Sequence, residues 1–312
     1  MSSPLLFSIY IDHLFILLRN SGLGCSIDKF YFGVLGYADD LLLLSASRSG
    51  LQAMVSICEQ FAKLKRLKFS TNVDLQKSKT KCIIFTSDKK SKTNIAPIIL
   101  NNDPLPWVDN LKHLGNILDV TNNMKKDCLN KRGKFIGQVN SLLQELHFAA
   151  PSVKMKLLNI YTTSFYGSSL WDIYSQEVTR LYSSWNVLVR NVFSLPWKTH
   201  RYLIQDISEC VHPKTMLSTR FVKFLESVSK CDKSCVRYLG RLVKSDKRTL
   251  VGRTLAKLAL ECGVDMESLT PSLVRRLGYF PICEGETKGR MMEIPGFTSD
   301  EIDTLILDAS TS

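Results

Sequence analysis

The sequence predicts an α+β fold in the first third of the chain, followed by a long region that is entirely helical. Up to residue 118, short apolar runs typical of strands alternate with segments whose apolar residues recur every three or four positions. Beyond residue 118 only the helical spacing continues, and prolines separate the segments. We therefore expect a strand-and-helix domain at 1–118 and helical regions at 119–200 and 201–312.

The first expected element is a helix over residues 4–18, with Pro4 in its first turn. The segment is apolar on most sides, so we expect it to be buried. Its abrupt beginning suggests an interior element of a larger domain that has been truncated. The other elements expected up to residue 118 are strands at 30–36, 41–44, 81–86, 95–100 and 108–114, a helix at 51–67 and a turn at 101–106.

The second part of the chain is expected to consist of packed helices. Apolar spacing predicts them over residues 124–147, 153–166, 177–193 and 217–225. The tail from about residue 285 is acidic, and its role is not readable from the sequence. Core packing is the expected role of all four tryptophans, Trp107, Trp171, Trp185 and Trp197.

The charge balance of this 312-residue chain points to a polyanionic partner. Its formal net charge is +12, which favours nucleic acid, with anionic lipid or simple solubility as alternatives. Residues 61–92 contain ten Lys or Arg against two Asp, a ratio that indicates phosphate contacts or a solvated helix face. The expected contacts form two groups: Lys63, Lys65, Arg66 and Lys68, then Lys125, Lys126, Lys131, Arg132 and Lys134.

Nine cysteines without regular spacing leave two interpretations open. Cys210, His212, Cys231 and Cys235 are a conceivable zinc site, whereas buried, reduced thiols explain the same residues more simply. No basic residue precedes the apolar N-terminal run, which argues against a signal peptide. No run of about 18 apolar residues indicates a membrane span. We expect an intracellular protein, nuclear or cytoplasmic, rather than a secreted one.

The tetrapeptide Tyr37-Ala38-Asp39-Asp40 between two apolar runs predicts a hairpin with an acidic tip. Two adjacent carboxylates against a buried sheet are destabilised by desolvation and mutual repulsion. A divalent cation removes both penalties, and magnesium binds carboxylates together with substrate phosphates. Successive residues of an extended chain face opposite sides, so a complete two-metal site needs a carboxylate from another element. The alternative is a solvated Asp-Asp turn.

Four ordered motifs extend this reading beyond the tetrapeptide. Over about 115 residues the chain carries, in this order, Ser3-Pro4-Leu5-Leu6-Phe7, the Tyr37–Asp40 tetrapeptide, Lys77-Ser78-Lys79 before an apolar strand, and Leu111–Gly115. In order and spacing they resemble the reverse transcriptase of non-LTR (LINE-type) retrotransposons. The resemblance implies the C-terminal part of a polymerase palm, an antiparallel sheet with packed helices, followed by a thumb and a C-terminal helical region.

The resemblance also implies roles for individual residues. Asp39 matches the metal-binding aspartate and Asp40 its supporting neighbour, while Tyr37 lies near the primer end. Ser3 and Pro4 close a loop that faces template and nucleotide. Lys77 or Lys79 matches the lysine near the triphosphate, and Lys77 is the favoured one of the two. Leu111–Gly115, with Lys112, His113 and Gly115, corresponds to the primer grip. The implied ligands are Mg²⁺, deoxynucleoside triphosphates, an RNA template, a DNA primer and their hybrid.

The chain departs from this family in one important respect. Members carry another catalytic aspartate upstream of the Ser-Pro-Leu-Leu-Phe segment, where only two residues stand in this sequence. The fingers region is missing as well. We therefore expect a fragment of an RNA-directed DNA polymerase that is inactive alone. A non-catalytic RNA- or DNA-binding module and an inert retroelement remnant are the alternatives.

Overall fold

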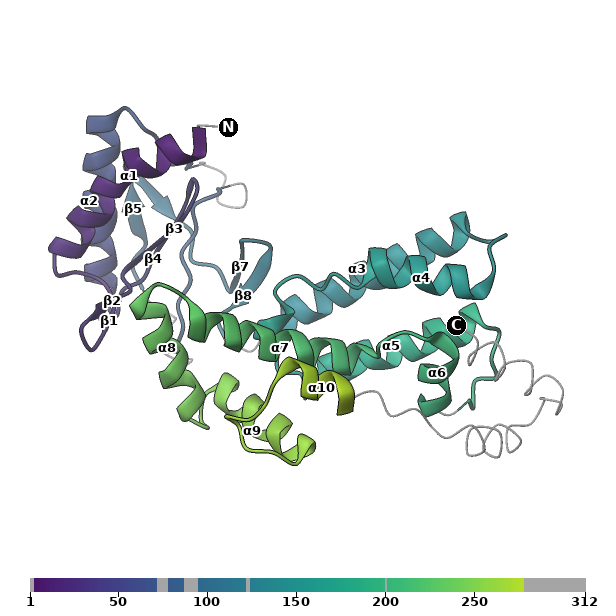
Figure 1. Cartoon of the computed structure of the whole chain (residues 1–312). Helices are drawn as coiled ribbons and strands as arrows, with labels where there is room; N and C mark the ends of the chain where they lie inside the picture. Colours follow the sequence, from purple (N-terminus) through teal and green to yellow (C-terminus); the bar gives the residue numbers. More distant parts are fainter. Residues whose placement is uncertain (1–2, 72–77, 87–94, 122–123, 200, 278–312) are drawn as a thin grey trace, which may run out of the picture. The chain divides into compact units, whose positions relative to one another are not determined.

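The computed structural model describes residues 3–71, 78–86, 95–121, 124–199 and 201–277 (Figure 1). The chain forms two compact units. Unit 1 comprises Met1–Leu111 and Asp119–Asn122, and unit 2 comprises Lys112–Leu118 and Asn123–Ser312. Short strand pairs together with many helices confirm the predicted α+β class. None of the helices in the described part of the chain combines the length and the apolar composition of a membrane span.

The two long helices of unit 1, α1 (Ser3–Asn20) and α2 (Arg48–Lys65), pack against each other. The Ser47 hydroxyl begins α2 by accepting a hydrogen bond from the Gly50 amide at 3.1 Å. Every third or fourth residue of α2 is buried, and these side chains meet a matching apolar row of α1. The buried cluster consists of Ile11, Leu14, Leu18, Met54, Cys58 and Phe61.

Helix α1 differs from the sequence prediction, which expected burial on most sides. Leu14 and Leu18 are fully buried, whereas Ile9 is 66% exposed and Ile16 is 48% exposed. The physical reason is that α2 and the neighbouring hairpin cover only one side of the helix. The opposite apolar side of α1 faces outward in unit 1.

The strands of the structure form two-stranded pairs. In unit 1, β1 (Ser26–Ile27) pairs with β2 (Phe30–Tyr31), β3 (Val34–Tyr37) with β4 (Asp40–Leu43), and β5 (Ile98–Leu100) with β6 (Asp103–Leu105), all antiparallel. The pair β7 (Asn110–His113) and β8 (Asn116–Asp119) spans the junction of the units. The strand predicted at 81–86 is reduced to one bridge between Cys82 and Trp107.

The turn predicted at 101–106 is shorter in the structure, because Asp103–Leu105 form strand β6 and only two residues join β5 to it. Asn101 and Asn102 both have positive φ, at 52° and 67°, which is the geometry of a type I′ hairpin turn. Helix α2 holds the same hairpin through Gln52, whose side chain donates to the Ile99 carbonyl at 2.9 Å and accepts from the Ile99 amide at 2.8 Å. The local turn and the helix contact together set the position of β5.

Unit 2 consists mainly of helices around two cores. The larger core surrounds Trp171 and Trp185, each 1% exposed, so their predicted burial is confirmed. The smaller core contains Phe221, Leu225 and Leu255. The elements are α3 (Lys125–Glu145), α4 (Pro151–Thr162), η2 (Ser168–Leu170), α5 (Gln176–Val192), α6 (Arg201–Ser208), α7 (Pro213–Lys230), α8 (Ser234–Ser245), α9 (Leu250–Cys262) and α10 (Pro271–Leu277).

The other two tryptophans differ from the prediction of core packing. Trp197 is 79% exposed, because it follows the end of α5 in a segment outside the periodic pattern. Trp107 is half-buried beside the Cys82 bridge. The apolar surroundings in the sequence therefore predicted burial correctly for Trp171 and Trp185, which the helices of unit 2 enclose, but not for Trp107 and Trp197.

Two helix ends of similar left-handed geometry allow a test of backbone strain. Arg66 ends α2 at φ 54° and ψ 34°, and Gly263 ends α9 at φ 65° and ψ 31°. Because a Cβ destabilises this left-handed conformation, we expect Arg66→Gly to stabilise α2 by about 0.5–1 kcal/mol. Urea-dependent hydrogen exchange of the α2 amides measures the effect. The control Gly263→Arg has open space at its Cβ and is expected to change α9 in the opposite sense. Equal signs for both variants would contradict the explanation.

Candidate functional site

The acidic hairpin of β3 and β4 projects from the core of unit 1. Tyr37 pairs with Asp40 in the register, so Ala38 and Asp39 form a two-residue turn, with Ala38 at φ 50°. Below the turn, Val34 and Leu41 pack against the α1–α2 cluster. The hairpin thus has an anchored body and a free acidic end.

Helix α1 sets the position of this hairpin through a close approach at Gly36. A Cβ on Gly36 would overlap the outer edge of the Phe15 ring, so the ring of Phe15 lies directly against β3 and would have to shift for a larger residue. The predicted helix and the acidic turn are therefore coupled by direct packing within unit 1.

The environment of the carboxylates differs from the prediction. Asp39 and Asp40 were expected against a buried sheet, but both are exposed, and Tyr37 is 67% exposed. The reason is that β3 and β4 form a sheet of only two strands whose tip extends beyond the apolar cluster. Water solvates both carboxylates there, so desolvation does not by itself require a cation.

The donor set at the tip suits a hard divalent cation in kind but not in number. Carboxylate oxygens are the ligands that magnesium prefers. In the described part of the chain, however, no group of three Asp, Glu, His or Cys side chains lies together. Asp39 and Asp40 thus provide a partial site, to which another carboxylate would have to be added for two metal ions.

The same observation bears on the zinc interpretation. Cys210, His212, Cys231 and Cys235 all lie among the described residues and do not form a group of three ligands. Burial raises the pKa of Cys210 to about 11, so its thiol is protonated near neutral pH and is a poor metal ligand. Among the described residues these four side chains therefore do not support the zinc alternative, and reduced thiols remain the simpler interpretation of the cysteines.

The hairpin of β7 and β8 carries the segment predicted to grip a primer. Leu114 and Gly115 form its turn, with φ of 46° and 80°. Lys112 is exposed and His113 is half-buried. Gly167 packs directly against Asn116 at the start of β8. A Cβ on Gly167 would overlap the side-chain amide of Asn116. The loop before η2 therefore supports this hairpin within unit 2.

A buried charged group ties the β7–β8 hairpin to α3. Asp127 is fully buried and accepts hydrogen bonds from the Ile117 amide at 2.9 Å, the Lys131 ammonium at 2.8 Å and the Trp171 indole at 2.8 Å. Lys131 also donates to the Asn116 side chain at 2.6 Å. Three hydrogen bonds and one paired charge satisfy Asp127, so this network orients the hairpin.

Lys131 therefore does not serve as predicted, and Arg132 has a partner within unit 2. Lys131 is 9% exposed and its ammonium is used by Asp127 and Asn116, so the prediction of a phosphate contact is wrong. Arg132 is half-buried and donates to the Ser184 hydroxyl at 2.9 Å. The sequence interpretation missed Asp127, although the four-residue spacing of Asp127 and Lys131 is a recognisable signal for an ion pair.

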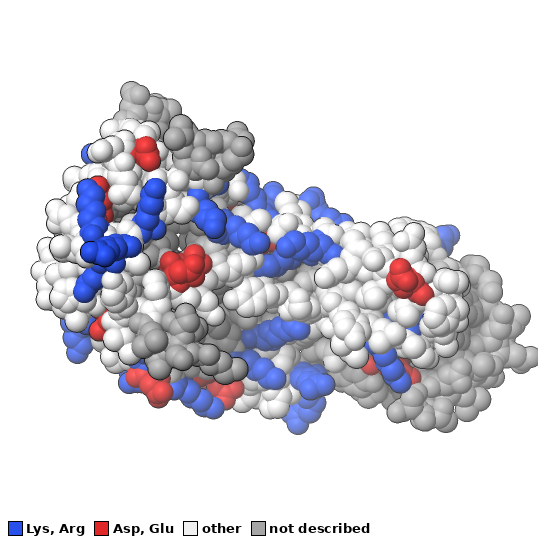
Figure 2. All heavy atoms as spheres, turned by 90° about the horizontal axis from the view of Figure 1, so that it is seen from above, with Lys and Arg blue, Asp and Glu red and all other residues white. Residues whose placement is uncertain are grey.

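The other predicted cations lie at the surface. Lys63, Lys65, Arg66 and Lys68 are exposed at the end of α2 and just beyond it, although Lys63 pairs with Glu59 at 2.8 Å. Lys125, Lys126 and Lys134 are exposed on α3, and Lys125 lies 3.1 Å from a Glu177 oxygen. Figure 2 shows a face on which basic side chains clearly outnumber acidic ones. Lys77 lies outside the described residues, as do the side chains of Ser3 and Pro4.

Comparison with known proteins gives a family match for the region that carries the acidic hairpin. A search of curated proteins finds no match. Among protein families, residues 1–118 match the reverse transcriptase (RNA-dependent DNA polymerase) family, and this region contains the Tyr37–Asp40 hairpin.

Proposed function

We propose that this chain is part of the RNA-directed DNA polymerase of a non-LTR retrotransposon. Residues 1–118 correspond to the C-terminal part of the palm and residues 119–200 to the thumb, with a C-terminal helical region after them. The observation that carries the proposal is the projecting tip of the β3–β4 hairpin, with Asp39 and Asp40, within the region matched by the reverse transcriptase family. The reaction adds a deoxynucleotide to a DNA primer paired with RNA.

The proposed roles follow the position of each residue. Asp39 and Asp40 would hold Mg²⁺, which supplies charge stabilisation to the transferring phosphate when it is bound. The exposed Tyr37 lies beside them at the end of β3 and is available to the primer end. The turn Leu114–Gly115, supported by Asp127, would hold the primer backbone through Lys112 and His113.

Two carboxylates are too few for the complete reaction. Nucleotidyl transfer by two metal ions uses carboxylates from two elements, and the described residues bring no third ligand to Asp39 and Asp40. We therefore propose that the chain by itself has almost no polymerase activity. Templated incorporation with the family's other catalytic aspartate supplied on a separate polypeptide tests the assignment, and product that forms without Asp39 would overturn it.

Non-catalytic binding of nucleic acid is a second candidate function, favoured by the exposed cations at the end of α2. We expect the double variant Arg66→Gln/Lys68→Gln to bind RNA–DNA hybrid more weakly. Because each phosphate contact contributes about 0.7–0.9 to the slope of log affinity against log salt, losing two contacts should reduce the slope by roughly 1.4–1.8. Fluorescence anisotropy across a salt series measures it.

The matched control for this binding experiment is Lys233→Gln/Lys247→Gln. It removes the same charge from exposed positions in the C-terminal helical region. We expect the control to leave the salt slope within error of the unchanged chain. A flat salt response of the unchanged chain, or equal effects of the two double variants, would contradict a binding surface at the end of α2.

A further inference from the structure

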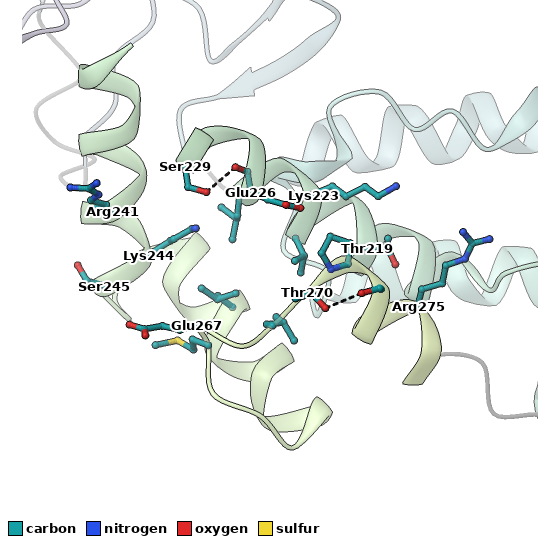
Figure 3. A pocket seen from close by; sticks show the side chains of 17 residues that line it. Thr219, Lys223, Glu226, Ser229, Arg241, Lys244, Ser245, Glu267, Thr270 and Arg275 are labelled. Atoms are coloured by element: carbon teal, nitrogen blue, oxygen red, sulfur yellow. Dashed lines mark hydrogen bonds between the residues drawn. The ribbon is translucent and has the colours of Figure 1, made fainter. Parts of the chain in front are cut away.

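Unit 2 contains a cavity of about 1190 Å³ bordered by α7, α8, α9 and the segment that leads into α10 (Figure 3). Apolar side chains from three of these elements form its floor, namely Val222, Leu225, Leu255, Met266 and Leu269. These residues belong to, or pack against, the smaller core of the unit. The cavity thus exposes part of an apolar core to a ligand.

The polar lining of this cavity is predominantly basic. Lys223, Arg241, Lys244 and Arg275 line it, against Glu226 and Glu267. Lys230 already pairs with Glu226 at 2.6 Å, which offsets one of the two acidic charges. In the described part of the chain, no hydrogen bond or ion pair is formed by any of the four lining cations. The cavity therefore offers unpaired positive charge beside an apolar floor.

Lys244 is the cation best placed to bind a ligand. Figure 3 shows its side chain reaching from α8 toward the cavity, whereas Arg241 extends away from it. Lys244 is half-buried, and this burial lowers the pKa of its ammonium group. A carboxylate next to it would restore the interactions that the ammonium has lost with water.

We propose that this cavity binds the acidic segment 299–308 of the same chain. The sequence of this segment carries Asp300, Glu301, Asp303 and Asp308 without any Lys or Arg. It also places Ile302, Leu305 and Ile306 at spacings of three and four. Acidic and apolar side chains on one short segment complement the basic rim and apolar floor of the cavity.

The covalent connection favours this occupant over a free partner. Pro271 and Arg275 of α10 line the cavity, and α10 ends at Leu277. The stretch from Leu277 to Asp300 can span up to roughly 75 Å when extended, far more than the return to the cavity requires. A segment linked in this way has an effective concentration of about a millimolar. The proposal does not depend on the reverse transcriptase assignment.

Zero-length cross-linking of the full-length chain tests the proposal. A carbodiimide joins an ammonium to a carboxylate only where the two are in contact, and mass spectrometry of the digest identifies the pair. We expect an amide between Lys244 and Asp300, Glu301 or Asp303 that is at least tenfold more abundant than any involving Lys247. Lys247 is the internal control, because it is exposed three residues further along the chain. Equal yields at Lys244 and Lys247 would overturn the proposal.

Two further measurements separate this occupant from the others. The yield of the Lys244 cross-link should stay constant when the protein is diluted a hundredfold. A yield that falls with dilution would show that the segment comes from a second copy of the chain and would overturn docking within one chain. Ile302→Asp/Leu305→Asp should reduce the cross-link at least tenfold, although every reactive carboxylate is retained. The control Ile294→Asp should leave it unchanged. If the double variant gave an unchanged yield, the segment would be held near Lys244 by charge alone. That result would contradict docking of its apolar side chains in the cavity.

Discussion

Asp39→Asn is expected to reduce templated incorporation by roughly 10³-fold or more in a reaction that also contains the family's other catalytic aspartate. The asparagine keeps the volume of Asp39 at the exposed turn and removes its negative charge. If Asp39 holds the metal ion, the loss therefore reflects missing charge stabilisation rather than a change in the hairpin. Extension of a labelled DNA primer on an RNA template measures the rate.

The same assay on the chain alone, without a separate polypeptide that supplies the other catalytic aspartate, tests whether the site is incomplete. Because the described residues hold only two carboxylates at the tip, we expect product no greater than the background of Asp39→Asn. Asp12→Asn is the matched control, since Asp12 is an exposed aspartate on α1 and is not part of the hairpin. Asp39-dependent product from the chain alone would contradict the incomplete site. No product in the complemented reaction would contradict the polymerase assignment.

Asp127→Ala is expected to destabilise unit 2 by about 3–5 kcal/mol. The substitution leaves the ammonium of Lys131 buried without its carboxylate and removes the acceptor for the Trp171 indole and the Ile117 amide. Urea unfolding followed by tryptophan fluorescence is a suitable measurement, because Trp171 and Trp185 both lie in this core. Asp265→Ala, at an exposed position in the same unit, should change the free energy of unfolding by less than about 0.5 kcal/mol.

A double variant separates the buried charge from the loss of packing. Asp127→Leu/Lys131→Met replaces both charged groups with apolar ones, so neither is left buried and unpaired. We expect it to be less destabilised than either single substitution, which is the behaviour of a buried ion pair. Strictly additive effects of the two substitutions would contradict the network, because they would show that Asp127 and Lys131 act independently.

Several features of the fold were predictable because they are encoded over a few residues. The alternation of apolar runs and turns predicted the β3–β4 hairpin. The segment predicted as a turn at 101–106 contains the turn between β5 and β6, but strand β6 itself was not predicted. Helical spacing predicted α2 and the first helices of unit 2. Helix α1 was predicted as an element but not in its burial, because burial depends on how many partners pack against a helix.

The candidate site shows the same division. The Tyr37–Asp40 tetrapeptide identified the acidic tip, but exposure of the carboxylates followed from the small size of the two-stranded sheet. The sequence alone does not distinguish Lys125 from Lys131, since both are basic residues of the same predicted helix. The structure exposes Lys125 and buries Lys131 beneath the loop that contains Trp171.

The sequence by itself thus determined the α+β class, the acidic turn and the resemblance of residues 1–118 to reverse transcriptases, a resemblance that the family match confirms. Only the tertiary structure decided which charges reach solvent, which of them orient the β7–β8 hairpin and where a basic cavity opens. The physical reason is that turns and helix faces depend on neighbouring residues. Burial and pairing depend instead on residues far apart in the chain, such as Asp127 and Trp171.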